Sequence, residues 1–258
     1  MALLTVKNLT KNFGGLCANS NISMEVASNE LVGLIGPNGA GKTTLFNMLT
    51  GVYEPSEGTI LLNNGDHEVS IGGMKPYKVT AMGIARTFQN IRLFKGLSVL
   101  ENVKIAMHKD VHYHLAQAIF RTPKFYQEEA RMEKQARELL SIMKLDQKSG
   151  ELADNLPYGE QRRLEIARAL ATNPKLLFLD EPAAGMNPQE TADLTRLIHQ
   201  IKDDFHLTVI LIEHDMSLVM TICERIYVLD YGKCIANGVP EVIKNDKRVI
   251  KAYLGEDI

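Results

Sequence analysis

Residues 31–44 read LVGLIGPNGAGKTT, and this stretch decides the fold. It opens with a short apolar run of strand length, and the segment from Gly36 to Thr43 then fits the pattern G-x-x-x-x-G-K-[ST]. Residues 43–50 have the composition of a helix, and Gly51 is placed to stop it. A strand, a glycine-rich turn and a helix in this order predict a loop whose N–H groups bind phosphate. A chance glycine turn is the alternative, but motif and context agree.

The residues of this loop predict the binding of a nucleoside triphosphate. Lys42 is expected to reach the β- and γ-phosphates, and the Thr43 hydroxyl is expected to ligate Mg²⁺. The cofactors predicted from this pattern are ATP and Mg²⁺. The predicted nucleotide contacts in this segment are Gly36, Pro37, Asn38, Gly39, Ala40, Gly41, Lys42, Thr43 and Thr44.

Two further apolar strands lead to polar residues. Residues 176–179 precede Asp180 and Glu181, and residues 207–212 lie two positions before His214. Ligands of open α/β sheets bind at the carboxyl ends of the strands, where these side chains would meet. Asp180 is expected to hold Mg²⁺, Glu181 to position or deprotonate the attacking water, and His214 to donate to the γ-phosphate. Each of these features alone is common in proteins. Because they occur together with the glycine-rich loop, the three residues are candidates for the nucleotide site.

The remaining sequence predicts an α/β chain with an inserted helical region. Residues 3–9 and 21–26 alternate like strands, and residues 59–62 run into the hairpin signal NNG. Residues 89–171 change to helical periodicity, which predicts a helical subdomain inserted in a single domain of residues 1–258. One helix of that region has an apolar stripe made of Met132, Ala136, Leu139, Leu140 and Met143. Strands alternating with amphipathic helices favour a mostly parallel sheet with both faces covered.

Composition excludes several classes of function. The 258 residues carry 29 basic and 31 acidic side chains, so no general basic patch points to nucleic acid. The three cysteines form no CxxC pair and are odd in number, which indicates reduced thiols. No apolar run approaches the length of a membrane span. The N-terminus lacks the pattern of a signal peptide. Three neighbouring histidines, His108, His112 and His114, suggest a metal only weakly, since no fourth ligand is evident.

The motifs together resemble the nucleotide-binding domain of an ABC transporter. LPYGEQRR at residues 156–163 resembles the signature sequence LSGGQ, and residues 184–187 resemble the D-loop. Gln89 matches the Q-loop glutamine, and Phe13 matches the aromatic residue that stacks on adenine. The resemblance implies a RecA-like P-loop NTPase core with an antiparallel β-subdomain and a helical insert. It also implies that Gln89 is a catalytic residue and a ligand of Mg²⁺. The signature residues Tyr158, Gly159 and Glu160 are implied to contact nucleotide.

That resemblance implies a head-to-tail dimer in which each ATP lies between one P-loop and the opposing signature. Two residues depart from the family pattern. Pro157 replaces the usual serine of the signature and offers neither a hydroxyl nor an N–H. Asn187 replaces the usual D-loop aspartate, and its position before Pro188 and three before Glu190 also predicts a helix N-cap.

Several segments narrow the resemblance to branched-chain amino-acid importers. They are residues 159–168, 181–188 and 212–216, the ending Ala252-Tyr253-Leu254-Gly255-Glu256, and the extra helical stretch 108–138 typical of the larger ATPase subunit. This implies a second, non-identical ATPase subunit, two membrane permeases and an extracytoplasmic binding protein for leucine, isoleucine or valine. The chain itself would sit at the cytoplasmic face of the cell membrane, without nucleic acid.

Other functions stay open at this point. Similar ATPases serve urea import and lipopolysaccharide export, and the ATPase does not touch the transported solute. A soluble ABC ATPase acting on DNA or ribosomes usually carries long coiled coils or two tandem ATPase domains, which this chain lacks. A switch with negligible turnover is disfavoured because Glu181 and His214 are both present.

Overall fold

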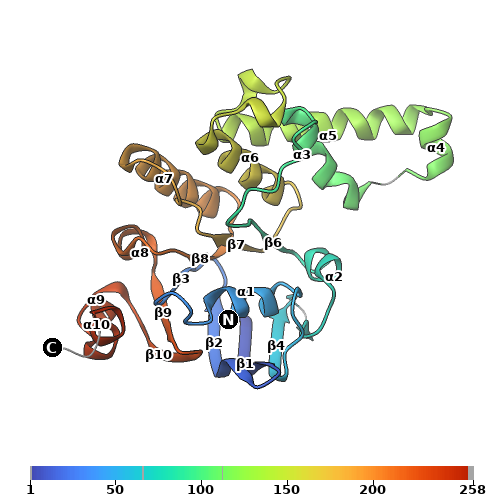
Figure 1. Cartoon of the computed structure of the whole chain (residues 1–258). Helices are drawn as coiled ribbons and strands as arrows, with labels where there is room; N and C mark the ends of the chain where they lie inside the picture. Colours follow the sequence, from blue (N-terminus) through green and yellow to red (C-terminus); the bar gives the residue numbers. More distant parts are fainter. Residues whose placement is uncertain (1, 66, 112, 255–258) are drawn as a thin grey trace. The chain divides into compact units, whose positions relative to one another are not determined.

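The computed structural model describes residues 2–65, 67–111 and 113–254. The chain divides into a core unit, Met1–Arg86 with Lys175–Ile258, and a helical unit, Thr87–Pro174. Figure 1 is coloured along the sequence, so the helical unit is its green-to-yellow part and the core unit contains both ends of the colour scale. His112, Gly255 and Glu256, which entered the sequence analysis, lie outside the described residues.

A six-stranded sheet forms the centre of the core unit. Its strands β6, β7, β8, β3 and β9 are parallel, and β10 is antiparallel to β9. In spatial order they are β10 (Lys233–Gly238), β9 (Arg225–Asp230), β3 (Leu31–Ile35), β8 (Thr208–Ile212), β7 (Leu176–Asp180) and β6 (Ile84–Arg86). Every residue of β3, β7 and β8 is buried, as expected for parallel strands covered on both faces.

A second, antiparallel sheet is built from the N-terminal strands. Its order is β2 (Leu16–Ala27), β1 (Ala2–Phe13), β4 (Glu57–Asn63) and β5 (Glu68–Ser70). The predicted strands 3–9 and 21–26 were too short. The β1–β2 register shifts between Val6 and Leu9 and again around Lys11, so the alternation of apolar and polar residues stops before the pairing does.

The helices of the core unit begin and end where local sequence signals place them. They are α1 (Lys42–Leu49), α2 (Pro76–Ala81), α7 (Pro188–Asp204), α8 (Met216–Ile222), α9 (Pro240–Lys244) and α10 (Lys247–Leu254). The predicted capping of α7 is confirmed, because Asn187 accepts from the N–H of Glu190 at 2.9 Å. Phe46 of α1 meets Phe178 of β7 edge-on with ring centroids 5.0 Å apart, which joins the first helix to the sheet.

The helical unit contains α3 (Val99–Ala106), η1 (Met107–Asp110), α4 (Leu115–Ile119), α5 (Pro123–Ile142), η2 (Asp146–Lys148), η3 (Ala153–Asn155) and α6 (Tyr158–Leu170). The predicted apolar stripe on α5 is confirmed, since all five of its members are buried. The buried Arg162 of α6 pairs with Glu165 at 2.9 Å and donates to the carbonyl of Phe88 at 2.6 Å. This pair fixes the segment that carries Gln89 onto α6. The predicted fold class, an α/β P-loop NTPase with an antiparallel sheet and a helical insert, is confirmed.

Candidate active site

The predicted phosphate loop joins β3 to α1 at the carboxyl edge of the parallel sheet. A side chain is excluded at two of its glycines. A Cβ on Gly36 would lie 2.1 Å from the carbonyl oxygen of Leu229, and a Cβ on Gly41 would lie 2.5 Å from Asn19 Nδ2. Gly41 also has a φ of 96°, which favours glycine. At these two glycines the backbone of the loop therefore packs directly against neighbouring residues.

Lys42 is buried at the start of α1. Its ammonium group donates to the carbonyl oxygens of Gly36 at 2.7 Å and Pro37 at 2.9 Å. Burial lowers the pKa of Lys42, and the negative charge of Glu181 partly offsets that shift. A buried cation bonded to neutral carbonyls would be better satisfied by an anion, so the loop fits the triphosphate of ATP.

The predicted carboxylates lie at the ends of the neighbouring strands. Asp180 is the last residue of β7 and is buried, and Glu181 follows it with a left-handed φ of 47°. The Glu181 N–H donates to the carbonyl of Ile212 at the end of β8. Glu181 Oε1 lies 2.6 Å from Nε2 of His214, so the structure brings these two predicted residues together. Two groups able to exchange a proton therefore share one edge of the sheet.

Glu213 is a buried acid at this edge that the sequence analysis did not single out. Its carboxylate accepts from the N–H of Ala183 at 2.8 Å and from the N–H of His214 at 3.2 Å. It thereby ties the segment after β7 to the segment after β8, next to Glu181. Burial is the main reason why the pKa of Glu213 is raised. The sequence signal was weak, because an acid after a strand is usually solvated.

Replacing Glu213 by Gln should change how stability depends on pH. A carboxyl group whose pKa is raised in the folded state stabilises the fold below its ordinary value of 4.5, and this contribution is lost as pH rises through the folded pKa. Glutamine carries no charge and keeps one of the two accepting oxygens, since Oε1 accepts from Ala183 and Oε2 from His214. We expect the variant to lose less stability than the parent between about pH 4.5 and neutrality. Urea unfolding at several pH values measures this, and parallel pH profiles for both proteins would contradict it.

Arg86 is a second residue that sequence reasoning missed. It ends β6, and its Nη2 lies 2.7 Å from Asp180 Oδ2, with both side chains less than a tenth exposed. Its Nη1 donates to Asn47 Oδ1 at 2.6 Å and to Thr50 Oγ1 at 3.1 Å on either side of the end of α1. The guanidinium group therefore links the helix after the phosphate loop to the carboxylate predicted to hold Mg²⁺.

Phe13 lies at the end of β1 and is exposed, as a stacking surface for a base requires. Tyr53 packs edge-on against it with ring centroids 5.2 Å apart, and the Lys11 ammonium lies 5.0 Å from the Phe13 centroid. Tyr53 was not predicted, because it lies 40 positions away from Phe13 in the sequence. An exposed aromatic pair with an adjacent cation is suited to an electron-rich ring beside phosphates.

The remaining predicted residues lie in the helical unit. Pro157 is the N-cap of α6 and provides no side-chain hydrogen bond, so the helix begins without the usual serine. Tyr158 and Gly159 form the first turn of α6, and Glu160 pairs with Lys148 at 2.6 Å. The backbone oxygen of Gln89 accepts from Arg162 Nη2 at 2.8 Å. The signature and the Q-loop glutamine are therefore both placed through α6.

Comparison with known proteins identifies the family of the chain. The family model described as ABC transporter matches residues 19–184, which is more than half of the chain. The chain belongs to the ABC transporter family. It is an ABC transporter ATPase, as the motifs predicted. A second family model, branched-chain amino acid ATP-binding cassette transporter, matches residues 233–258.

Individual relatives cover nearly the whole chain. The high-affinity branched-chain amino acid transport ATP-binding protein LivG of Escherichia coli is 47% identical over 98% of both chains. The lipopolysaccharide export ATP-binding protein LptB of the same species is 36% identical over 100% of this chain and 99% of its own. An ABC-transporter ATP-binding cassette crystallised in its ADP conformation has a TM-score of 0.84 at 31% identity, with 99% and 100% coverage. The predicted resemblance to branched-chain amino-acid transport ATPases is confirmed.

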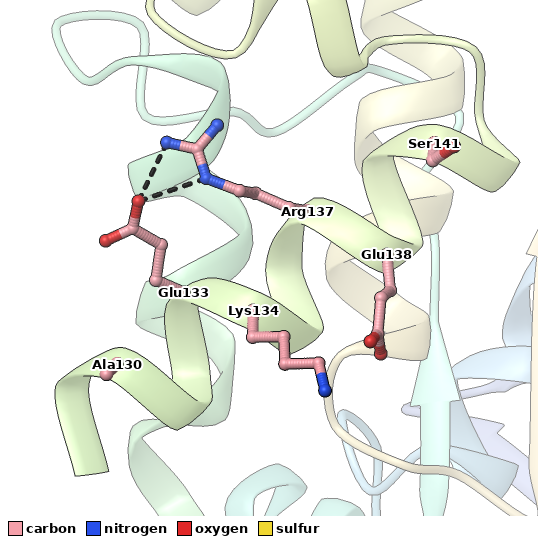
Figure 2. A pocket seen from close by; sticks show the side chains of 6 residues that line it. All are labelled: Ala130, Glu133, Lys134, Arg137, Glu138 and Ser141. Carbon is pink, nitrogen blue, oxygen red and sulfur yellow. Dashed lines mark hydrogen bonds and ion pairs between the residues drawn. The ribbon is translucent and has the colours of Figure 1, made fainter. Parts of the chain in front are cut away.

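A shallow depression of about 530 Å³ lies along α5 and contains none of the predicted site residues. Figure 2 shows its lining, with the guanidinium group of Arg137 turned toward Glu133. The bond from Arg137 Nη2 to Glu133 Oε1 is 2.7 Å, a pair spaced i, i+4 along one helix face. Charged side chains of mixed sign on one helix describe a solvated face rather than a ligand site. Among the residues that the structure describes, no three or more His, Cys, Asp or Glu side chains are grouped so that they could hold a metal ion.

Proposed function

We propose that this ATPase powers the import of branched-chain amino acids across a membrane. The observation that carries the proposal is the 47% identity to LivG over 98% of both chains. The match of residues 233–258 to the branched-chain family model supports it at the C-terminal end. Leucine, isoleucine and valine are the solutes that this proposal implies.

We assign roles to the core residues on the basis of their placement. Lys42 and the loop from Gly36 to Thr44 bind the phosphates, and Phe13 stacks on adenine. Glu181 takes a proton from the attacking water, and His214, 2.6 Å from it, orients that carboxylate and donates to the γ-phosphate. The buried Asp180 carboxylate, the exposed Thr43 hydroxyl and the Gln89 amide are oxygen donors of the kind that Mg²⁺ prefers. When bound, that ion would neutralise charge on the phosphates.

The helical unit is proposed to act on a neighbouring subunit. Residues 1–258 are taken as one nucleotide-binding domain with an inserted helical subdomain near residues 89–171. Tyr158, Gly159 and Glu160 would contact ATP held by a second ATPase subunit in a head-to-tail dimer. With a non-identical neighbour, Pro157 would face the neighbour's nucleotide, and the two ATP sites would be chemically unequal.

The proposal places this chain at the cytoplasmic face of a membrane, beside two permease subunits. An extracytoplasmic binding protein would deliver the solute to those permeases. No helix among residues 2–65, 67–111 and 113–254 has the length and apolarity to span a bilayer. The segment after Gln89 is suited to docking a permease helix, because Arg92 and Phe94 are both exposed. Their backbones are held in place, since Glu165 accepts from the Arg92 N–H at 3.2 Å and Asn102 accepts from the Phe94 N–H at 2.9 Å.

Reversing the charge of Arg92 and truncating Phe94, in the variant Arg92→Glu/Phe94→Ala, should weaken assembly with the permease by about tenfold or more. A docking aromatic side chain and an arginine each typically contribute 1 kcal/mol or more, on the order of tenfold together. Co-purification from detergent-solubilised membranes measures the effect. The variant Tyr77→Ala removes another exposed aromatic ring, on α2, and serves as control. Intact assembly of the double variant would rule out this docking segment.

Uptake of labelled solutes tests the function directly. Cells lacking the gene are expected to lose uptake of leucine, isoleucine and valine, and the parent gene is expected to restore it. The 36% identity to LptB makes lipopolysaccharide export the second candidate. Normal leucine uptake together with lipopolysaccharide accumulating inside the cell would favour that candidate and contradict import.

A further inference from the structure

Helix α4 and the turn that follows it expose a cluster of large apolar side chains. Leu115 is 77% exposed, Ile119 66% and Phe120 79%, and no residue of α4 is buried. Leu115 and Ile119 are spaced i, i+4 and therefore lie on one face of the helix. Figure 1 shows α4 at the projecting end of the long helix α5. We call Leu115, Ile119 and Phe120 the apolar tip.

The backbone fixes the apolar tip in place. Arg121 ends α4 in the left-handed conformation, with a φ of 46°. The N–H of Arg121 donates to the carbonyl of Ala118, and the N–H of Thr122 donates to the carbonyl of Gln117. This is the hydrogen-bond pattern of a Schellman helix end. The exposure of these side chains is thus built into a defined turn.

Aromatic residues on either side of the apolar tip are turned back onto α5. The ring of Tyr113 packs edge-on against Phe125 at 5.2 Å, and its hydroxyl donates to Glu129 Oε1 at 3.1 Å. The partly buried rings of Tyr113 and Phe125 therefore anchor the segment to α5. The apolar tip is left outside this packing, although a fold without a partner gains nothing by exposing it.

The charge around the apolar tip is positive. Residues 115–126 contain Arg121 and Lys124, both exposed, and no acidic residue. The nearest carboxylates of α5 are engaged elsewhere, with Glu128 paired to Arg131 at 2.8 Å and Glu129 paired to Lys104 at 2.8 Å. The two cations beside the tip are therefore not offset by neighbouring acids within the described part of this segment.

We propose that the apolar tip inserts into the interface of an anionic phospholipid bilayer. Large apolar side chains flanked by cations are the pattern that binds a headgroup layer, where the side chains enter the acyl boundary and the cations meet phosphate. Helix α4 has five residues, too few to present the i, i+4, i+7 row by which a helix fills a protein groove. The inference rests on the proposed function only in placing the chain beside a membrane.

Flotation of the purified full-length chain with vesicles tests this. We expect the chain to float with vesicles containing phosphatidylglycerol more than with vesicles of phosphatidylcholine alone, and less so as salt is raised. Leu115→Ser/Phe120→Ser should weaken this binding by about tenfold or more, from the loss of two apolar side chains. Arg121→Gln/Lys124→Gln should weaken it by about fivefold per charge removed.

Matched controls remove the same groups from the core unit. Tyr77→Ser replaces an exposed ring, and Lys75→Gln/Lys78→Gln removes two exposed charges, all on or beside α2. Both controls should float like the parent, and all variants should bind ATP like the parent, which verifies folding. The test is independent of the transported solute, so a failure of leucine uptake would not affect it.

Three results would overturn the proposal. The parent does not float with anionic vesicles, or it floats equally with neutral ones, or Leu115→Ser/Phe120→Ser floats like the parent. If Leu115→Ser/Phe120→Ser floats like the parent and also fails to assemble with permease subunits in detergent, the tip docks a protein and the lipid assignment is wrong.

Discussion

Replacing Glu181 by Gln is expected to slow ATP hydrolysis by about 100- to 10,000-fold while ATP still binds. The reason is local, because Glu181 Oε1 lies 2.6 Å from His214 Nε2 at the edge of the sheet where Lys42 begins α1. Glutamine nearly preserves the shape and the contact with His214 but accepts no proton from water. The loss should therefore fall on turnover rather than on affinity, and the ATP-bound dimer should persist longer.

Phosphate release by the assembled ATPase measures turnover, and a fluorescent nucleotide measures binding. The control is Glu57→Gln, the same chemical change at an exposed position of β4. It should leave both quantities unchanged. Unchanged phosphate release in Glu181→Gln would show that Glu181 is not the catalytic base. Loss of ATP binding would instead show that the carboxylate supports the loop around Lys42.

The parts of the site that lie within one continuous stretch of sequence could be predicted from the sequence. The loop from Gly36 to Thr43 is one continuous motif between a strand and a helix, so its sequence carries its geometry. Asp180 and His214 were found because each follows an apolar strand, and parallel strands bring their carboxyl ends to one edge. The pattern of apolar strands therefore sufficed to predict that Asp180 and His214 lie at the same edge of the sheet.

Features that depend on pairing between distant residues were not predictable. Arg86 and Asp180 are 94 positions apart, and nothing near Arg86 marks it as a partner for a carboxylate. Glu213 is one residue from a predicted site, but only the folded structure shows that its carboxylate accepts from two backbone N–H groups. The true lengths of β1 and β2 depend on register shifts, which break the alternation on which strand prediction relies.

Arg86→Met is expected to lower the free energy of unfolding by about 3 kcal/mol or more. The Arg86 and Asp180 side chains are 8% and 6% exposed, and their charged atoms are 2.7 Å apart. Removing only the cation breaks a buried ion pair from one side, and Asn47 Oδ1 loses its donor at 2.6 Å. The expected cost is therefore that of breaking a buried ion pair by removing one partner, which is larger than the net gain of the intact pair.

Urea unfolding of a double-mutant cycle separates that cost from a general loss of packing. Asp180→Asn removes the charge that Arg86 compensates, so Arg86→Met/Asp180→Asn should be less destabilised than the sum of the two single variants. The exposed pair of Arg196 and Asp193 provides the control, since Arg196→Met should stay within about 1 kcal/mol of the parent. If Arg86→Met costs no more than Arg196→Met, the buried pair does not hold the end of β7. Additive single costs would mean that Arg86 stabilises the core unit by packing on Phe46, whose ring centroid lies 5.6 Å from its guanidinium carbon, and not through Asp180.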